Sequence, residues 1–169
     1  HALPDFTSPA GEPSGALYGL SSMLLRIITD LEPDYIAACY DLPEPTVRHE
    51  VYADYKGTRQ KTDDALVAQL ISSRRVFEAF QIPMYERAVF EADDILGTIG
   101  ELLAKDDSVE TIIASGDMDT LHLIDDDHVR VYTLKKGLND TILYDEKAVV
   151  ARFGFPPHLI PDYKGLRGA

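Results

Sequence analysis

Three carboxylates within four positions, followed by a helical apolar pattern, constrain this chain more than any other stretch. They lie in residues 90–97, which read Phe-Glu-Ala-Asp-Asp-Ile-Leu-Gly. The apolar residues that follow recur at the spacing of one helix face: Ile95, Ile99, Leu102 and Leu103. Glu91, Asp93 and Asp94 therefore begin a helix, whose dipole favours negative charge by about 0.3–1 kcal/mol per exposed group.

These three acids also repel one another, so we expect a cation among them. Glu91 and Asp94 are three positions apart and share one helix face, whereas Asp93 points elsewhere and could serve a neighbouring site. The alternative is a solvated helix start whose charge only matches the dipole.

Two further acidic places follow predicted strands. Residues 109–115 form an apolar run that leads into Asp117 and Asp119, and residues 35–40 form another that ends at Asp41. In open parallel sheets, ligand sites form outside the carboxyl ends of the strands. We therefore expect Asp41, the Glu91 group and the Asp117 pair to converge on one crevice.

The rest of the chain alternates strands with helices, which is typical of an α/β fold with a mostly parallel central sheet flanked by helices. We expect a helix that Ser14 caps and Pro33 stops, and a second one that Thr62 caps and Pro83 breaks. Further helices are expected at 91–105, after Asp119 and at 145–153, and strands at 82–86, 128–133 and 141–144. The acidic run at 125–127 is expected to be a solvated loop.

Residues 42–61, called the basic segment below, have no clean period. They gather four bases, two tyrosines and a histidine in an acidic protein. Basic residues interleaved with aromatics suit phosphate contacts and base stacking on single strands. The alternative is a surface loop of ordinary composition, and we expect His49 to be an exposed structural histidine.

Length and charge allow one domain that binds nucleic acid only locally. At 169 residues and 45% hydrophobic composition, we expect a single domain over 1–169. The net charge of −13, from 29 acids and 16 bases, argues against nucleic-acid binding through bulk charge. It leaves room for a local basic path, and two bound divalent ions would offset about four of those charges.

The remaining sequence features indicate a cytoplasmic protein. Cys39 is the one cysteine and lies in a predicted strand, where a buried hydrophobe is expected. There is no disulfide framework, no signal peptide and no apolar run near the length of a membrane span. Because the chain begins at His1 without an initiator Met, we expect an internal piece of a longer protein, and we expect a monomer.

Carboxylates without paired cysteines or a histidine cluster suit hard cations such as Mg²⁺ or Mn²⁺. Two such ions about 3.5–4 Å apart can generate a hydroxide and stabilise both oxygens of an in-line displacement at phosphorus. The basic segment would hold the phosphodiester. The sequence therefore predicts hydrolysis of a nucleic-acid phosphodiester.

Over essentially all its length the chain resembles the 5′→3′ exonuclease domain of bacterial DNA polymerase I, a structure-specific 5′ (flap) nuclease family with a PIN-like fold. The motifs that carry the resemblance are Gly11–Ala16, Asp41 with Thr46–Glu50, Tyr55–Arg59, Glu91–Asp94, Gly116–Asp119 and Ile160–Tyr163. The resemblance implies a divalent-metal-dependent exonuclease and flap endonuclease that cuts DNA at 5′ ends or flaps in replication and repair.

The resemblance also implies the metal ligands. Asp41, Glu91 and Asp93 would belong mainly to the first metal site. At or near the second site would lie Asp94, Asp117 and Asp119, some of them acting through water.

The basic segment would supply the contacts to DNA. Lys56 and Arg59 resemble the family's basic pair at the foot of a helical arch, which contacts the scissile phosphate and the threaded strand. Tyr55 resembles a neighbouring aromatic that stacks on a base, Arg48 a backbone contact, and Lys61 belongs to the same nucleic-acid-binding set. A C-terminal polymerase domain in the native chain is a further expectation.

The chain departs from the family at both ends. The family has an Asp-Gly pair on a first strand upstream of His1, and a further acidic motif and a helix-three-turn-helix module downstream of Gly168. Ala169 stands where the family usually has an acid, so we expect an incomplete second metal site and an impaired fragment. Met118 stands where a lysine is common.

Two alternatives remain open. Residues 117–121, Asp-Met-Asp-Thr-Leu, also fit the aspartyl-phosphate motif of haloacid-dehalogenase-like phosphatases, which would use Asp117 and Asp119. Those enzymes need a lysine and an acidic pair after further α/β units, and only about fifty residues follow. The other alternative is a non-catalytic DNA-binding or scaffolding piece whose acids only cap helices.

Overall fold

A computed structural model describes residues 6–52, 54–57, 62–136 and 140–167. The chain divides into two compact units, His1–Ile95 and Leu96–Ala169, each of which is described by itself. The division falls within helix α4 (Ala92–Leu103), so the first turn of α4 belongs to the first unit.

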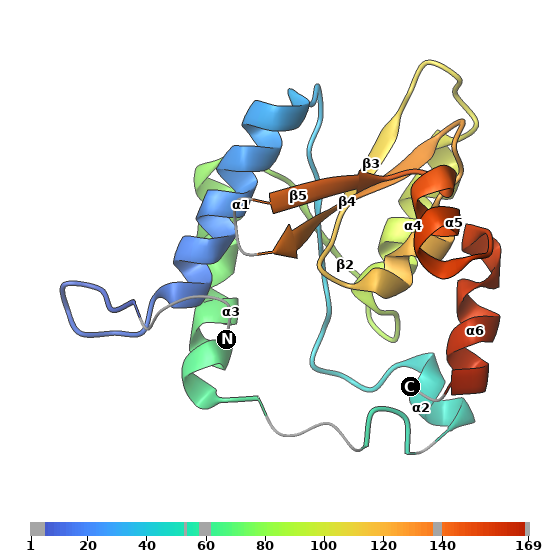
Figure 1. The fold of residues 1–169 in the computed structure, drawn as a ribbon. Coiled ribbons are helices and arrows are strands. Elements are labelled where there is room, and N and C mark those ends of the chain that lie inside the picture. The colour runs from blue at the N-terminus through green and yellow to red at the C-terminus, as the bar shows by residue number, and fades with distance from the viewer. Residues whose placement is uncertain (1–5, 53, 58–61, 137–139, 168–169) are drawn as a thin grey trace. The chain divides into compact units, whose positions relative to one another are not determined.

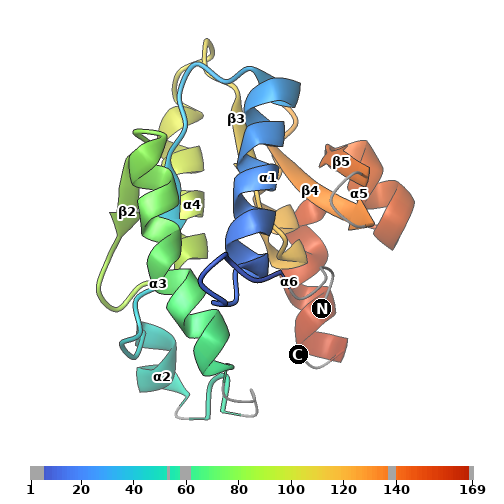
Figure 2. The same ribbon diagram turned by 90° about the vertical axis from the view of Figure 1, so that its left-hand side faces the viewer.

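The first unit pairs two helices with a small parallel sheet. Helices α1 (Gly15–Leu31) and α3 (Asp64–Ala79) lie side by side (Figures 1 and 2). Strands β1 (Ala38–Tyr40) and β2 (Met84–Glu86) are parallel, with Cys39 opposite Tyr85. Their core is built from Leu24, Ala38 and Ile82, against which pack Ile28, Ile36, Tyr40, Val76, Phe77 and Met84.

Local signals set the ends of these helices. Ser14 is the N-cap of α1 as expected, and Glu32 closes the helix in the left-handed conformation just before Pro33. The expected cap of α3, Thr62, is wrong by one residue. Asp63 is the N-cap, because its carboxylate accepts a hydrogen bond from the backbone N of Ala65 at 2.7 Å.

Within the basic segment, Val47–Val51 form the short helix α2. Five residues are too few to show a helical period, so the sequence pattern did not reveal it. Cys39 lies in a strand as expected but is only half-buried, and this partial burial raises the pKa of its thiol, as for an unreactive cysteine.

The second unit is built around a three-stranded sheet. The strands β3 (Thr111–Ala114), β4 (Val129–Lys136) and β5 (Asp140–Tyr144) lie in that order, β3 parallel and β5 antiparallel to β4. The same unit contains two 3₁₀ helices, η1 (Met118–Leu123) and η2 (Pro157–Leu159). It also contains two α-helices, α5 (Glu146–Phe153) and α6 (Ile160–Arg167). Fully buried Leu121, Val131 and Val149 lie in its core.

The α/β class is confirmed, and in the described part of the chain two of the three pairs of neighbouring strands are parallel. The described strands form two hydrogen-bonded sheets, one in each unit, where a single central sheet was expected. Alternating strands and helices indicate the class of fold, but the alternation does not specify which strands pair.

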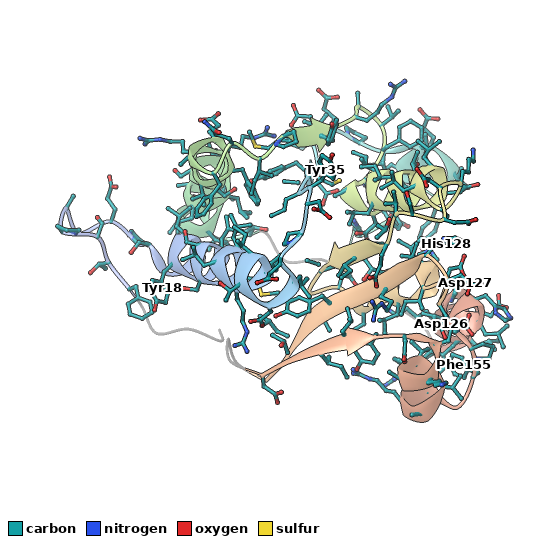
Figure 3. All side chains as sticks on the ribbon, turned by 90° about the horizontal axis from the view of Figure 1, so that it is seen from above. Tyr18, Tyr35, Asp126, Asp127, His128 and Phe155 are labelled. Carbon is teal, nitrogen blue, oxygen red and sulfur yellow. The ribbon has the colours of Figure 1, made fainter. Side chains whose placement is uncertain are left out.

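The acidic run at 125–127 is exposed and lies in a turn, as expected for a solvated loop, but its residues have hydrogen-bond partners. Asp125 and Val129 form a β-bridge, and the Asp126 carboxylate accepts a hydrogen bond from the backbone N of Glu146 at 2.6 Å. Figure 3 labels Asp126 and Asp127 in this turn, and Tyr18 and Tyr35 among the exposed aromatics of the first unit. Asp126 thus satisfies one of the unpaired amides at the start of α5.

Among the described residues, no helix combines the length and the apolarity that crossing a membrane requires.

Candidate metal and nucleic-acid site

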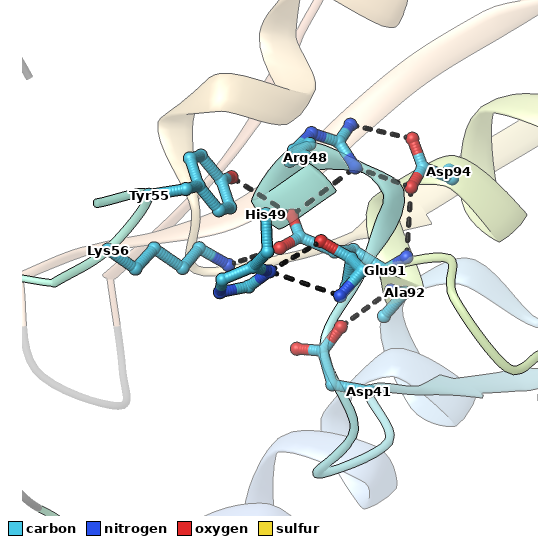
Figure 4. Close-up of polar contacts among 9 residues, drawn as sticks. Asp41, Arg48, His49, Tyr55, Lys56, Glu91, Ala92 and Asp94 are labelled. Carbon is cyan, nitrogen blue, oxygen red and sulfur yellow. Dashed lines mark hydrogen bonds and ion pairs between the residues drawn. The ribbon is translucent and has the colours of Figure 1, made fainter. Parts of the chain in front are cut away.

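The first turn of α4 gathers acids from two parts of the first unit. The Asp94 carboxylate accepts a hydrogen bond from the backbone N of Glu91 at 2.9 Å, which caps the helix. Asp41, which follows β1, accepts one from the backbone N of Ala92 at 2.7 Å (Figure 4). The end of β1 and the start of α4 therefore meet. This brings Asp41 to the Glu91 group, as the sequence predicted.

Arg48 of α2 binds Asp94 through both guanidinium nitrogens. Nη1 donates to Oδ2 and Nη2 to Oδ1, each at 2.7 Å, and Nη1 lies 3.7 Å from Oε2 of Glu91. These hydrogen bonds lower the pKa of the Asp94 carboxyl, although partial burial opposes the shift. The same pair raises the pKa of Arg48 above its usual range.

Glu91 binds the other end of the basic segment. Lys56 Nζ donates to Oε1 at 2.7 Å, and the Tyr55 hydroxyl donates to Oε2 at 3.2 Å. The Glu91 side chain is only 12% exposed, so these donors replace most of its water. Lys56 adopts a left-handed backbone conformation with φ 58°, which is strained for a residue with a side chain.

His49 supports this arrangement of the basic segment. This role was not predicted from the sequence. The side chain is half-buried, where an exposed histidine was expected, because its Nδ1 accepts a hydrogen bond from the backbone N of Thr46 at 3.1 Å and closes a capping box at the start of α2. Its ring also meets the edge of Tyr55, with centroids 5.3 Å apart. The three-residue spacing between Thr46 and His49 is the signal that could have revealed the cap.

The acids of the second unit lie at the start of η1. Asp117 is its N-cap and accepts a hydrogen bond from the backbone N of Asp119 at 2.9 Å, while Asp119 is paired with Lys164 of α6. No sequence pattern signalled Lys164, because it comes from an element 45 residues away. Met118 packs against the core of this unit. That these acids converge with the Glu91 group stays a prediction.

The donor set suits a hard cation, because every candidate ligand is a carboxylate. Yet among the residues that the structure describes, no group of three His, Cys, Asp or Glu side chains is arranged to hold a metal ion. Arg48 and Lys56 bind two of the carboxylates instead. Two expected DNA-binding residues, Arg59 and Lys61, lie outside the described residues.

Comparison with known sequences identifies relatives over nearly the whole chain. Residues 1–154 match the family described as 5′-3′ exonuclease, N-terminal resolvase-like domain. DNA polymerase I of Bacillus caldotenax is 38% identical over 167 residues, and that of Bacillus subtilis (strain 168) is 35% identical over 167 residues. Both alignments cover 99% of this chain and 19% of the relative, so the chain spans about a fifth of those proteins.

Two solved structures of bacteriophage T5 share the fold. The T5 D15 protein co-crystallised with metal ions matches with a TM-score of 0.70 and 19% identity, covering 88% of this chain and 58% of that one. The T5 D15 flap endonuclease in a pseudo-enzyme–product complex with DNA and metal ions matches with a TM-score of 0.69 and 16% identity, covering 100% and 61%.

Proposed function

Because the chain belongs to the 5′-3′ exonuclease N-terminal domain family, we propose that it is the nuclease part of a DNA polymerase I-type protein. Its reaction is hydrolysis of DNA phosphodiesters at 5′ ends or flaps, with two divalent ions, Mg²⁺ or Mn²⁺. One observation supports this most strongly: Asp41, Glu91 and Asp94 gather at one helix start within contact of Arg48 and Lys56. The carboxylates that we propose as metal ligands thus lie next to the cations that we propose as contacts to the phosphate.

We assign the carboxylates to the two ions as the family resemblance suggests. Asp41, Glu91 and Asp93 would hold the first ion, and Asp94, Asp117 and Asp119 would serve the second. Arg48 binds both oxygens of Asp94, so this carboxylate would serve its ion through water. When bound, ions of this kind activate water and stabilise negative charge on phosphate oxygens.

The basic segment binds the DNA in this proposal. Arg48 and Lys56 supply positive charge for the phosphodiester, and Arg59 and Lys61 extend that contact. Tyr55 offers a ring on which a base can stack. The segment provides the local basic path that a protein of net charge −13 needs for binding DNA.

The wider setting of the chain is also a proposal. The relatives are about five times as long, which supports a polymerase region joined to this domain in the native protein. We place the protein in the cytoplasm, where its DNA lies, and as a monomer. The family match favours the nuclease over a phosphatase that forms an aspartyl-phosphate at Asp117.

Cleavage of a 5′-labelled flap DNA in Mn²⁺ tests the function. We expect cleavage that EDTA abolishes and that Asp117→Ala and Glu91→Gln reduce by at least about 100-fold, as for loss of a group that stabilises developing charge. The assay is run on this chain and on a chain extended at both ends. Absence of metal-dependent cleavage by both chains would refute the proposal and favour the non-catalytic alternative.

A further inference from the structure

The two ion pairs of the site differ in a way that the proposed function does not explain. Arg48 and Asp94 are held by two bonds of 2.7 Å, and Asp94 also caps α4. Lys56 reaches Glu91 through one bond of 2.7 Å. The first pair is therefore a fixed part of the helix start, while the second rests on a single contact.

Glu91 needs a positive charge close to it. Its side chain is 12% exposed and lies three positions from Asp94, on the same helix turn. Shielding a carboxylate from water is costly unless it is paired with a positive charge and hydrogen-bonded. In this structure the protein provides that charge itself, through Lys56, with Arg48 farther away at 3.7 Å.

We propose that Lys56 is the internal counter-ion of Glu91 in the metal-free protein, and that a divalent cation displaces it and so frees its ammonium for a DNA phosphate. This inference rests on the proposed function, because it takes Glu91 as a metal ligand. Among the described residues no group of three His, Cys, Asp or Glu side chains is arranged to hold a metal ion, and Lys56 is the cation bound to Glu91 at 2.7 Å.

The chemistry of Lys56 suits such an exchange. An ammonium is a compact charge on a flexible four-carbon stem, so it can leave one anion for another without moving the backbone far. The Lys56 side chain is 29% exposed, so solvent reaches it, and its backbone is already strained. The fork of Arg48 stays on Asp94 and keeps the basic segment anchored beside α4.

Metal binding and DNA binding are then coupled through one side chain. A cation on Glu91 releases Lys56, and a phosphate that holds Lys56 leaves Glu91 open to the cation. By linkage, each ligand raises the affinity for the other by the same factor.

Calorimetric titration with Mn²⁺, without DNA, tests the inference. Lys56→Gln removes the competing charge, and we expect Mn²⁺ affinity to rise by at least about fivefold, the lower range of measured couplings. Lys56→Arg keeps a charge and should bind Mn²⁺ like the wild type. Arg26→Gln is the matched control, because it removes one positive charge from an exposed pair with Asp30 in the same unit.

The outcomes separate this inference from the proposed function. If Mn²⁺ binding is absent, or is unchanged by Glu91→Gln, the metal site itself is refuted and the counter-ion role with it. If binding depends on Glu91 but Lys56→Gln and Arg26→Gln change it equally, only the counter-ion role is refuted. Thermal melting of each variant in EDTA confirms that it is folded. If Lys56→Gln unfolds, Lys56→Met takes its place, because it also removes the charge and keeps an unbranched side chain.

Discussion

Arg48 and Asp94, which are 46 residues apart in the sequence, share two hydrogen bonds of equal length, 2.7 Å each. A lysine cannot reproduce this fork, because its ammonium presents a single charged nitrogen. We expect Arg48→Lys to lower the free energy of unfolding by roughly 1–2 kcal/mol. Urea unfolding followed by circular dichroism measures the change.

Arg26→Lys is the control for that experiment. Arg26 pairs with Asp30 one helix turn away, through a contact of 3.0 Å on the surface of α1. The same substitution there should cost less than about 0.5 kcal/mol. Equal losses in the two variants would show that the fork between Arg48 and Asp94 adds nothing to stability.

The Asp94 pair predicts a dependence of stability on pH. Since Arg48 lowers the pKa of Asp94 in the folded protein, the unfolded chain takes up the proton first as pH falls. The stabilisation is therefore complete above the ordinary Asp pKa of about 3.9 and is lost as pH falls through the lower folded value. The advantage of wild type over Asp94→Asn in urea unfolding should be constant from pH 7 to 5 and shrink toward pH 3, whereas an advantage independent of pH would contradict the assignment.

Tyr55 allows its ring and its hydroxyl to be tested separately. Tyr55→Phe removes the bond to Glu91 but keeps the ring, while Tyr55→Ala removes both. If the ring stacks on a base, only Tyr55→Ala should weaken binding of flap DNA, by about 1–3 kcal/mol. Fluorescence anisotropy in a cleavage-deficient Asp117→Ala background measures this, and equal weakening by both variants would assign the role to the hydroxyl.

The core of the second unit predicts a contrast between two leucines. Leu121 is 0% exposed, so Leu121→Ala leaves a cavity and should cost about 2–5 kcal/mol. Leu166 is 91% exposed, and Leu166→Ala should change stability by less than about 0.5 kcal/mol. Thermal melts of the two variants provide the comparison, and a similar loss for both would place Leu121 outside the packed core.

Local signals in the sequence predicted much of this fold. The periodic apolar residues after Asp94 predicted α4, and the expected helix at 145–153 corresponds to α5, because both depend on residues within one or two turns. Contacts between distant residues could not be predicted from local pattern. The pair of Asp119 and Lys164, the bond from Glu146 to Asp126 and the choice of strand partners all depend on how the chain folds back on itself.

In the candidate site, too, the local features could be predicted from the sequence and the contacts between distant residues could not. The acids of α4 and of η1 were evident from their positions at element ends, and so was the basic character of the basic segment. The pattern did not show that this segment binds the acids themselves, since which cation meets which carboxylate depends on tertiary geometry. The capping role of His49 was not predicted, because the five residues of α2 are too few to show a helical pattern in the sequence.

The hydrogen bond from Glu146 to Asp126 joins two residues twenty positions apart and spans both β4 and β5. Strand pairing and this hydrogen bond join β4, β5 and the start of α5, and segments joined in this way often open and close as one cooperative unit. Native-state hydrogen exchange should then give the amides of β4 and of the first turn of α5 similar opening free energies. In Asp126→Ala, the amides of α5 should exchange faster than those of β4, so that a single substitution divides one cooperative unit into two.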